Sequence, residues 1–457
     1  MSKPGTPENP LRVAIVGSGP SGFYATEALI KSGLTVEIDM LERLPAPFGL
    51  VRHGVAPDHQ KLKQAIQLYD KIADSGEFTM LANVTVGRDI TIDELCKTHH
   101  AIILTCGAET DRKLGIPGED LNGSYTATEF VGWYNGHPDY RDREFDLSHE
   151  NAVIIGQGNV AADVSRILAK TVDELKHTDI AQHALDVLAE SKIRNIYVIG
   201  RRGPAQAKFT PKELREFGEL TDCDPIVNPD DLVLNEASQA ELDDKTNIGS
   251  LKIYQLFQEF STRENPSKSK RCHFQFLLSP VELKGNGKLE KIVLEKNQLS
   301  GEPFKQSARG TGEKLELDAG ILFRSIGYRG IPMPGVPFDE KSGTFPNQDG
   351  HITENGTPVK QLYTAGWIKR GPTGIIGTNR ADSVATVNTL LAEIDSLDSG
   401  EKPGKNGLIE LLNQREVRYV TYQDWRKIDR EEIKNGEPKG KPREKFTSVN
   451  SMLSVLD

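Results

Sequence analysis

The sequence predicts an α/β protein with two parallel sheets, each organised around its own glycine-rich turn. Three observations support this fold class. An apolar run at residues 12–16 is followed at once by glycines and then by apolar residues at helical spacing over residues 23–30. The same order of strand, glycine turn and helix returns at residues 152–170. Strands and helices alternate between these points, as they do in parallel sheets.

The remaining elements of the first unit follow in chain order. We expect a second strand at residues 35–41, a helix at 58–73, a strand at 78–86 and a buried strand at 101–106. The second unit has its own partner strand at 195–199, preceded by a helical insertion at 178–191. Residues 273–282 and 288–299 alternate like a hairpin, and a buried strand at 320–326 closes the unit near Gly327.

The chain then returns to the first sheet. A short apolar strand at residues 362–365 leads into a glycine-rich turn and a helix at about 374–394, and a charge-rich helical tail ends in a small apolar helix at 449–456. The first domain is therefore predicted to be discontinuous. We expect two Rossmann-like units of the three-layer β/β/α type found in glutathione reductase, with boundaries at residues 1–110, 111–328 and 329–457.

Composition excludes several classes of protein. The 457 residues carry a formal charge of -10, which argues against broad binding to nucleic acid or to anionic membranes. No apolar run is long enough to span a membrane, and the N-terminal residues do not resemble a targeting segment. The cysteines are far apart in the sequence, so we expect no metal site, a reducing compartment and a cytoplasmic location; they are Cys96, Cys106, Cys223 and Cys272.

The first glycine turn has the spacing of a dinucleotide-binding site. Gly17 permits the turn, Gly19 allows a pyrophosphate to approach the backbone, and Gly22 lets helix and strand pack closely. Glu42 stands 20 residues after Gly22 at the end of the next strand, where a carboxylate can accept hydrogen bonds from a ribose. The alternative is a solvated carboxylate at a strand end.

The second turn, at residues 156–161, is followed by a partner strand that ends in Arg201 and Arg202 instead of an acid. Paired guanidinium groups hold a 2'-phosphate through forked hydrogen bonds, whereas a carboxylate would repel it. The second site should therefore prefer NADP to NAD, unless the two arginines are only part of a solvated loop. Two unlike sites imply two cofactors held together, and FAD with NADP(H) is the simplest pairing.

Four longer motifs, at residues 47–59, 156–163, 200–204 and 366–377, together resemble the adrenodoxin reductase type of NADPH-ferredoxin reductase. The similarity runs from about residue 12 to residue 443 and includes the actinobacterial, cytoplasmic members. It implies hydride transfer from NADPH to FAD and then one-electron transfers to a ferredoxin-type iron–sulfur protein, by a monomer or weak dimer with no metal of its own.

The resemblance also implies the cofactor contacts. Those to FAD would be Gly17, Gly19, Ser21, Gly22, Glu42, Leu50, Val86, Trp367, Gly374, Ile375 and Ile376. Those to NADP would be Gln157, Gly158, Asn159, Val160, Arg201, Arg202, Glu213 and Gly374. The helix that begins near Gly374 would direct its positive end toward the reduced ring.

Two residues are candidates for a catalytic role. We hypothesise that His59, at the start of a helix, meets Glu216 across the cleft, where an ionised carboxylate would raise the pKa of the histidine. His59 could equally be a surface histidine. Glu213 also has a structural explanation, because Thr210, Pro211 and Glu213 form the pattern of a capping box.

A basic surface is needed to dock an acidic ferredoxin on an acidic enzyme. The candidates are Lys208, Lys212 and Arg215 in one group and Lys268, Lys270 and Arg271 in another. Three alternative functions stay open: a flavin monooxygenase, a dithiol–disulfide oxidoreductase, which the lack of paired cysteines disfavours, and a binding protein that senses both cofactors without turnover.

Overall fold

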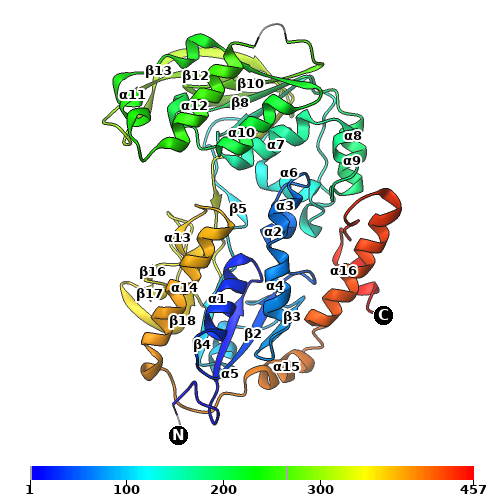
Figure 1. The fold of residues 1–457 in the computed structure, drawn as a ribbon, viewed down its shortest axis with the longest axis vertical. Coiled ribbons are helices and arrows are strands. Elements are labelled where there is room, and N and C mark those ends of the chain that lie inside the picture. The colour runs from blue at the N-terminus through cyan, green and yellow to red at the C-terminus, as the bar shows by residue number, and fades with distance from the viewer. Residues whose placement is uncertain (1–2, 264–265) are drawn as a thin grey trace.

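The computed structural model describes residues 3–263 and 266–457, which form two lobes (Figure 1). The lower lobe in this view holds the N-terminal strands together with the segment drawn in orange, and the upper lobe is drawn mainly in green. Helix α16 (Tyr422–Gly436), in red, runs along one side from the lower lobe toward the upper one. The predicted α/β class is confirmed.

The sheet of the lower lobe contains strands from both ends of the chain. Its order is β16-β17-β18-β4-β1-β2-β3, where β1 pairs in parallel with β2 and β4, and β18 pairs in parallel with β4. The predicted return of the chain to the first sheet is therefore confirmed. The bounds are β1 (Leu11–Val16), β2 (Val36–Glu42), β3 (Phe78–Ala82), β4 (Ala101–Leu104), β16 (Asn347–Gln348), β17 (His351–Glu354) and β18 (Thr357–Thr364).

Both faces of this sheet are covered, which explains why its strands are continuous apolar runs. Side chains alternate between faces, so Val13 and Ile15 of β1 enter one core while Ala14 and Val16 enter the other. Residues of α1 (Pro20–Ile30), α4 (Ile66–Ala73), α14 (Ile376–Ala392), α16 (Tyr422–Gly436) and α17 (Val449–Ser454) fill the first core. Residues of α5 (Ile92–Thr98) and α15 (Gly404–Gln414) contribute to the second.

The upper lobe has three layers. Its parallel sheet has the order β6-β14-β7-β8-β10-β9, and an antiparallel sheet, β11-β12-β13, covers one of its faces through a shared apolar core. Helices fill the core on the other face. The strands are β6 (Ser124–Thr126), β7 (Asn151–Ile155), β8 (Asn195–Ile199), β9 (Cys223–Val227), β10 (Lys270–Gln275), β11 (Leu278–Lys284), β12 (Lys291–Ser300), β13 (Ser307–Asp318) and β14 (Ile321–Arg324).

The helices of this lobe include α7, which follows the second glycine turn. Their bounds are α6 (Ala127–Tyr134), α7 (Asn159–Ala169), α8 (Val172–Leu175), α9 (Gln182–Ala189), α10 (Pro211–Glu216), α11 (Glu236–Asp243) and α12 (Ile248–Ser261). No helix within residues 3–263 and 266–457 combines the length and the apolar character needed to cross a membrane.

The chain passes between the lobes twice, and the two crossings pair with each other. β5 (Thr110–Asp111) and β15 (Tyr328–Arg329) form a short antiparallel ladder in which Tyr328 faces Asp111. In Figure 1, β5 lies between the two lobes. The ladder ties the two connections together at the point where the second unit is inserted into the first.

Several predicted bounds differ from the observed ones by a few residues, and in three places the structure shows a local cause. The hairpin arm predicted at residues 273–282 is split, because Leu277 adopts a left-handed conformation with φ of +54° and divides β10 in the parallel sheet from β11 in the antiparallel one. The strand predicted at 78–86 ends at Ala82, since Asn83 is also left-handed, with φ of +60°. The helix predicted at 58–73 consists of α3 (Gln60–Lys63) and α4, joined by a tighter turn.

A buried ion triad joins the lobes near the C-terminus. Asp179, which precedes α9 in the upper lobe, lies 2.7 Å from the amine of Lys63 in α3 and 3.1 Å from that of Lys445. All three side chains are buried. Burial alone would raise the pKa of Asp179, but the two lysines outweigh it and hold the pKa below the ordinary value. Burial lowers the pKa of Lys445 to about 7.

We expect Asp179→Asn to destabilise the protein by about 3–5 kcal/mol, because it leaves two buried ammonium groups without a counter-charge. Chemical denaturation at neutral pH measures this loss. Because the folded pKa of Asp179 is depressed, its contribution is present above a pH of about 4 and is lost as the pH falls through the folded pKa. Asp173→Asn is the control, since this carboxylate is 84% exposed in its pair with Lys176. Equal stabilities of the two variants would contradict the expectation.

Candidate functional site

The first glycine turn joins β1 to α1. Gly17 has φ of +107°, a conformation that residues with a Cβ rarely adopt. A Cβ on Gly22 would lie 2.2 Å from the carbonyl oxygen of Gly17, so α1 can approach the turn this closely only with glycine there. A Cβ on Gly19 would meet nothing within 4 Å. The fold therefore requires Gly17 and Gly22, whereas Gly19 borders open space at the N-terminus of α1.

Glu42 ends β2 beside this turn. Its Oε2 accepts hydrogen bonds from the backbone N–H of Ser18 at 3.1 Å and from the Ser18 hydroxyl at 2.6 Å, and its Oε1 accepts one from the N–H of Leu44 at 3.0 Å. A carboxylate offers about four acceptor positions, so these contacts fix its orientation and leave acceptor capacity. The geometry fits the ribose contact predicted for this residue.

The second glycine turn repeats this arrangement between β7 and α7. Gly156 has φ of +134°, and a Cβ there would lie 2.1 Å from the carbonyl oxygen of Ser325. A Cβ on Gly158 would again meet nothing within 4 Å. Each turn thus combines a glycine that the fold requires with one that borders open space, as expected where a pyrophosphate approaches the backbone.

The polar side chains of the second turn hold the neighbouring loops. Gln157 donates from Nε2 to the carbonyl oxygen of Gln275 at 2.8 Å, and the Oδ1 of Asn159 accepts from the N–H of Thr210 at 2.7 Å. Val160, in the first turn of α7, packs partly buried against the core of this lobe. Because these side chains are engaged within the protein, the backbone N–H groups at the N-terminus of α7 are the groups suited to a phosphate.

Arg201 and Arg202 follow β8, at the same edge of the sheet. Arg201 is exposed and Arg202 is half-buried. The carbonyl oxygen of Arg201 accepts from the Nδ2 of Asn297 at 2.9 Å, and that of Arg202 accepts from the N–H of Leu277 at 3.1 Å. These backbone contacts fix the loop against β12 and the β10–β11 turn, so both arginines stand just beyond the end of β8.

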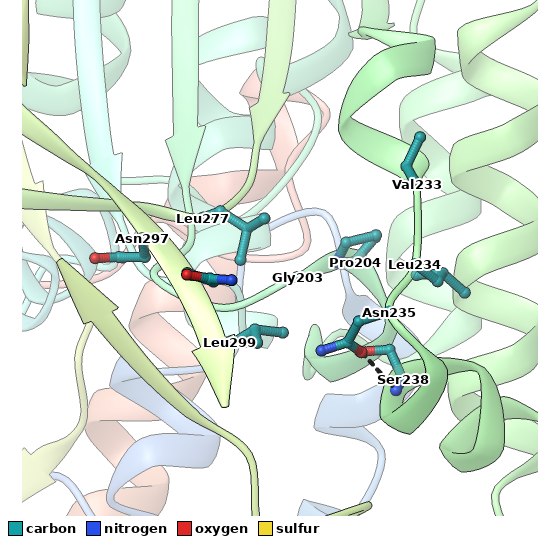
Figure 2. A pocket seen from close by; sticks show the side chains of 10 residues that line it. Gly203, Pro204, Val233, Leu234, Asn235, Ser238, Leu277, Asn297 and Leu299 are labelled. Carbon is teal, nitrogen blue, oxygen red and sulfur yellow. Dashed lines mark hydrogen bonds between the residues drawn. The ribbon is translucent and has the colours of Figure 1, made fainter. Parts of the chain in front are cut away.

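A cavity of about 180 Å³ adjoins the arginine loop, between the antiparallel sheet and the segment that leads into α11 (Figure 2). Its wall mixes aliphatic groups with amides and a hydroxyl, and it carries no charged side chain. The lining residues are Gly203, Pro204, Val233, Leu234, Asn235, Ser238, Leu277, Asn297, Gln298 and Leu299. An uncharged lining suits a flat heterocycle better than a phosphate.

The segment at residues 366–377 packs against the first glycine turn. Gly366 has φ of +83°, and a Cβ there would lie 2.1 Å from the hydroxyl of Ser21 at the start of α1. The next residue, Trp367, opens α13 (Trp367–Arg370), and among the described residues no partner is found for its buried indole N–H. Its ring centroid lies 5.3 Å from that of Tyr328. This unpaired donor is available to a bound group.

The start of α14 is open to solvent. Gly374 has φ of +82°, Ile375 is the N-cap residue with 66% of its surface exposed, and Ile376 is the first helical residue. The backbone N–H of Ile375 donates to the hydroxyl of Thr378 at 3.2 Å. The exposed side chain of Ile375 is free to contact an apolar ring system bound at this helix N-terminus.

Two further predicted contacts lie on the lower lobe. Leu50, the first residue of α2 (Leu50–His53), is 37% exposed. A Cβ on the preceding Gly49 would lie 3.1 Å from the Cα of Gly19, so α2 begins beside the first glycine turn. Val86 is half-buried and packs against one core of the lower sheet. The predicted FAD residues thus come from separate segments of this lobe.

His59 and Glu216 meet, as the sequence analysis predicted. The Nε2 of His59, from the lower lobe, lies 2.9 Å from the Oε2 of Glu216 at the end of α10, and 3.5 Å from the Oε2 of Glu213. Burial lowers the pKa of His59, but the hydrogen bond to Glu216 outweighs it, and the pKa is raised. Burial likewise raises the pKa of Glu216, while the bond to His59 brings it below its ordinary value.

The predicted capping box at Thr210 is half formed. The Thr210 hydroxyl accepts from the backbone N–H of Glu213 at 3.4 Å. The return bond is replaced, because the N–H of Thr210 donates to Asn159 and the carboxylate of Glu213 accepts from Arg166 at 3.0 Å. The local sequence matches the box, but a buried guanidinium competes more strongly for the carboxylate.

Sequence reasoning missed three charged residues at this site. Arg166 on α7 is fully buried and forms ion pairs with Asp58 of the lower lobe and Asp163 of its own helix. The signal was present in the sequence, because Arg166 stands in an otherwise apolar helix face, where a charged side chain needs buried partners. The partners come from separate segments, so the sequence alone did not identify them.

Comparison with known proteins finds relatives that match nearly the whole chain. No protein-family model matches the chain. It is 44% identical over 452 residues to the NADPH-ferredoxin reductase FprA of Mycobacterium leprae, covering 97% of this chain and 98% of the relative. It is 43% identical over 461 residues to the mitochondrial NADPH:adrenodoxin oxidoreductase of Salvelinus fontinalis, covering 98% and 92%.

The solved structures agree with these relatives. Mycobacterium tuberculosis FprA in complex with NADPH superposes with a TM-score of 0.92 at 43% identity, covering 98% of this chain and 99% of the other. A second structure of the same enzyme, which carries a covalently modified NADP+, gives the same TM-score and identity. The two-lobed fold and the arrangement of its glycine turns are therefore shared over nearly the whole chain.

Proposed function

The chain belongs to the family of NADPH-ferredoxin reductases and NADPH:adrenodoxin oxidoreductases, and from this membership we propose that it passes electrons from NADPH through FAD to a ferredoxin-type iron–sulfur protein. One observation supports this most strongly. A single chain carries two glycine turns with open space at Gly19 and Gly158, one followed by Glu42 and the other by Arg201 and Arg202. One site thus suits a ribose and the other a phosphate.

FAD is held by the lower lobe. The pyrophosphate lies at the N-terminus of α1 beside Gly17, Gly19, Ser21 and Gly22, and Glu42 binds the ribose. Leu50, Val86, Trp367, Gly374, Ile375 and Ile376 surround the rest, with the unpaired indole N–H of Trp367 as a donor. When bound, FAD supplies chemistry that the side chains lack, since it accepts two electrons together and releases them singly.

NADP is held by the upper lobe. The backbone of residues 157–160 receives the pyrophosphate, and Arg201 and Arg202 bind the 2'-phosphate. The neighbouring uncharged cavity would hold the adenine ring, and Glu213 and Gly374 would lie on the nicotinamide side. In this proposal residues 1–110 and 329–457 form the FAD domain and residues 111–328 form the NADP domain.

His59 and Glu216 are the catalytic pair in this account. They come from different lobes and are 2.9 Å apart, so they meet only when the NADP domain is seated on the FAD domain. The pair orients the nicotinamide and exchanges a proton at the histidine ring. The described cysteines are free, as expected in a reducing cytoplasm. The protein acts as a monomer or a weak dimer in this proposal.

The test is electron delivery to an iron–sulfur protein. With NADPH and a [2Fe–2S] ferredoxin, we expect reduction of cytochrome c that depends on the ferredoxin. Oxygen consumption that depends instead on an added organic substrate would favour a flavin monooxygenase. Binding of both cofactors without any turnover would favour a cofactor-sensing protein.

Ferredoxin docking is proposed for the exposed group formed by Lys208, Lys212 and Arg215. The alternative group is less suitable, because the amine of Lys268 donates to the carbonyl oxygen of Leu220 and that of Lys270 to the carbonyl oxygen of Leu168. Contacts within the chain thus occupy those amines.

We expect Lys212→Glu to raise the KM for ferredoxin about five- to tenfold at low salt, since reversing an interface charge costs about 1 kcal/mol or slightly more. The KM for NADPH should stay unchanged. Lys405→Glu, at an exposed position of α15 in the lower lobe, is the matched control. Equal effects of the two reversals, or turnover insensitive to added salt, would exclude this docking surface.

A further inference from the structure

Arg166 lies at the centre of the contact between the two lobes. Its side chain is fully buried on α7, and its guanidinium group makes contacts in both lobes. It donates to both carboxylate oxygens of Asp58, at 2.7 and 3.1 Å, and to Asp163 at 2.6 Å and Glu213 at 3.0 Å. These four bonds use the N–H of Nε, one N–H of Nη1 and both N–H groups of Nη2, which fixes the guanidinium plane.

One of these N–H groups also faces the histidine. The Nη2 of Arg166 lies 3.4 Å from the Nδ1 of His59, on the side of the ring opposite to Glu216. Arginine has donors only and keeps its proton at any working pH. Nδ1 can accept from this N–H only when it is unprotonated, which would place the ring proton on Nε2, where Glu216 would accept it.

The two partners of the ring stabilise opposite charge states. A carboxylate at Nε2 favours the cationic ring, whereas a guanidinium at Nδ1 favours the neutral one. The cationic ring needs an acceptor for its second proton, and the oxygen that lies closest on that side is Oδ1 of Asp163, at 4.0 Å from Nδ1. We therefore expect Nδ1 to interact with Arg166 when it carries no proton and with Asp163 when it carries one.

We propose that Arg166 is a positioning residue of the reduction site: by donating to Nδ1 of His59 it stabilises the neutral ring against Glu216, so that His59 is a reversible proton carrier and not half of a permanent ion pair. This inference rests on the assignment of His59 to the reduction site. It adds a residue that contacts neither of the proposed cofactors and acts through the histidine.

The other charged groups around the ring are consistent with this balance. Asp58, Asp163, Glu213 and Glu216 face Arg166, His59 and Lys170, whose amine lies 2.8 Å from Asp58. Tyr134 lies close to the same carboxylates, and burial raises the pKa of its hydroxyl well above the ordinary value. Burial also raises the pKa of Asp163 to about 6, despite its contact with Arg166.

The test follows the histidine directly. Nitrogen NMR of protein labelled at histidine reports which ring nitrogen carries the proton, and the signal of His59 is identified by its loss in His59→Gln among the ten histidines. In the unchanged protein we expect the neutral ring to carry its proton on Nε2. A neutral ring with the proton on Nδ1 overturns the proposal without any variant.

Three variants test the balance of charge. Arg166→Met should raise the midpoint of the His59 titration by about one pH unit, and Glu216→Gln should lower it. Lys170→Met is the matched control, because it removes a cation from the same cluster without touching the ring; its midpoint should move by at most about 0.3 units and its tautomer should not change. An unchanged midpoint in folded Arg166→Met overturns the proposal.

The rate of flavin reduction by NADPH should depend on pH with a midpoint that is highest in Arg166→Met, intermediate in the unchanged protein and lowest in Glu216→Gln. Failure of this inference is distinct from failure of the proposed function. If the protein binds no FAD, the proposed function fails while the NMR result still stands. If the protein reduces ferredoxin but the midpoint of the His59 titration is the same in Arg166→Met as in the unchanged protein, only the role of Arg166 is excluded.

Discussion

Replacing Arg201 and Arg202 together by alanine is expected to lower kcat/KM for NADPH by about 100- to 1000-fold. Each charge-assisted hydrogen bond to a phosphate contributes about 1.5–3 kcal/mol, and about 1.4 kcal/mol corresponds to a factor of ten. Arg201 is exposed beyond the end of β8, so its removal leaves no buried partner unsatisfied and the fold should be retained. Steady-state kinetics with a one-electron acceptor measure the change.

The same variant should use NADH about as well as the unchanged protein does. NADH lacks the 2'-phosphate, so it has no group for these arginines to hold. Arg309→Ala, at an exposed position of β13, is the matched control and should change neither constant. A parallel fall with NADPH and NADH would mean that the arginines stabilise the loop instead of recognising the phosphate.

The second large effect is expected at the central glycine of each turn. A Cβ on Gly19 meets nothing in the protein, so Gly19→Ala should fold with unchanged stability when no FAD is bound. The same Cβ would enter the space that the pyrophosphate needs, and FAD affinity should fall at least about 100-fold. Fluorescence titration of the apoprotein with FAD measures this loss, and thermal unfolding of the apoprotein measures the stability.

Two further glycines serve as controls for this experiment. Gly158→Ala should spare FAD and weaken NADP binding, since it borders open space in the second turn. Gly76→Ala also meets nothing within 4 Å, but it lies before β3, away from both turns, and should change neither affinity. If Gly19→Ala kept its FAD, the first turn would not be the pyrophosphate site.

The sequence predicts the parts of this molecule that depend on local pattern. Apolar runs buried on both faces, and glycines such as Gly17 and Gly156 that must adopt positive φ, leave a local signature that does not depend on distant residues. The position of Glu42 relative to its turn follows from strand length alone. These elements therefore could be located. The return of the chain to the first sheet was predicted from the apolar run at residues 362–365 and the glycines after it, although the observed strand begins earlier, at Thr357.

Features that depend on contacts between distant segments could not be predicted in the same way. The triad of Lys63, Asp179 and Lys445 joins residues more than a hundred positions apart. Leu277 divides two strands whose alternation is continuous in the sequence, because the turn is imposed by the loop that carries Arg202. The His59–Glu216 contact was a hypothesis from residue type, and the guanidinium of Arg166 beside it was not foreseen.

The central claim is that FAD bound by the lower lobe receives electrons in pairs from NADPH bound by the upper lobe and releases them singly. Anaerobic rapid mixing of the FAD-loaded protein with NADPH tests it most directly. We expect the yellow flavin absorbance to bleach rapidly, to bleach far more slowly with NADH, and to return in two one-electron steps when oxidised ferredoxin is added. Failure of the protein to bind FAD, or bound flavin that stays yellow after mixing with NADPH, would contradict the account.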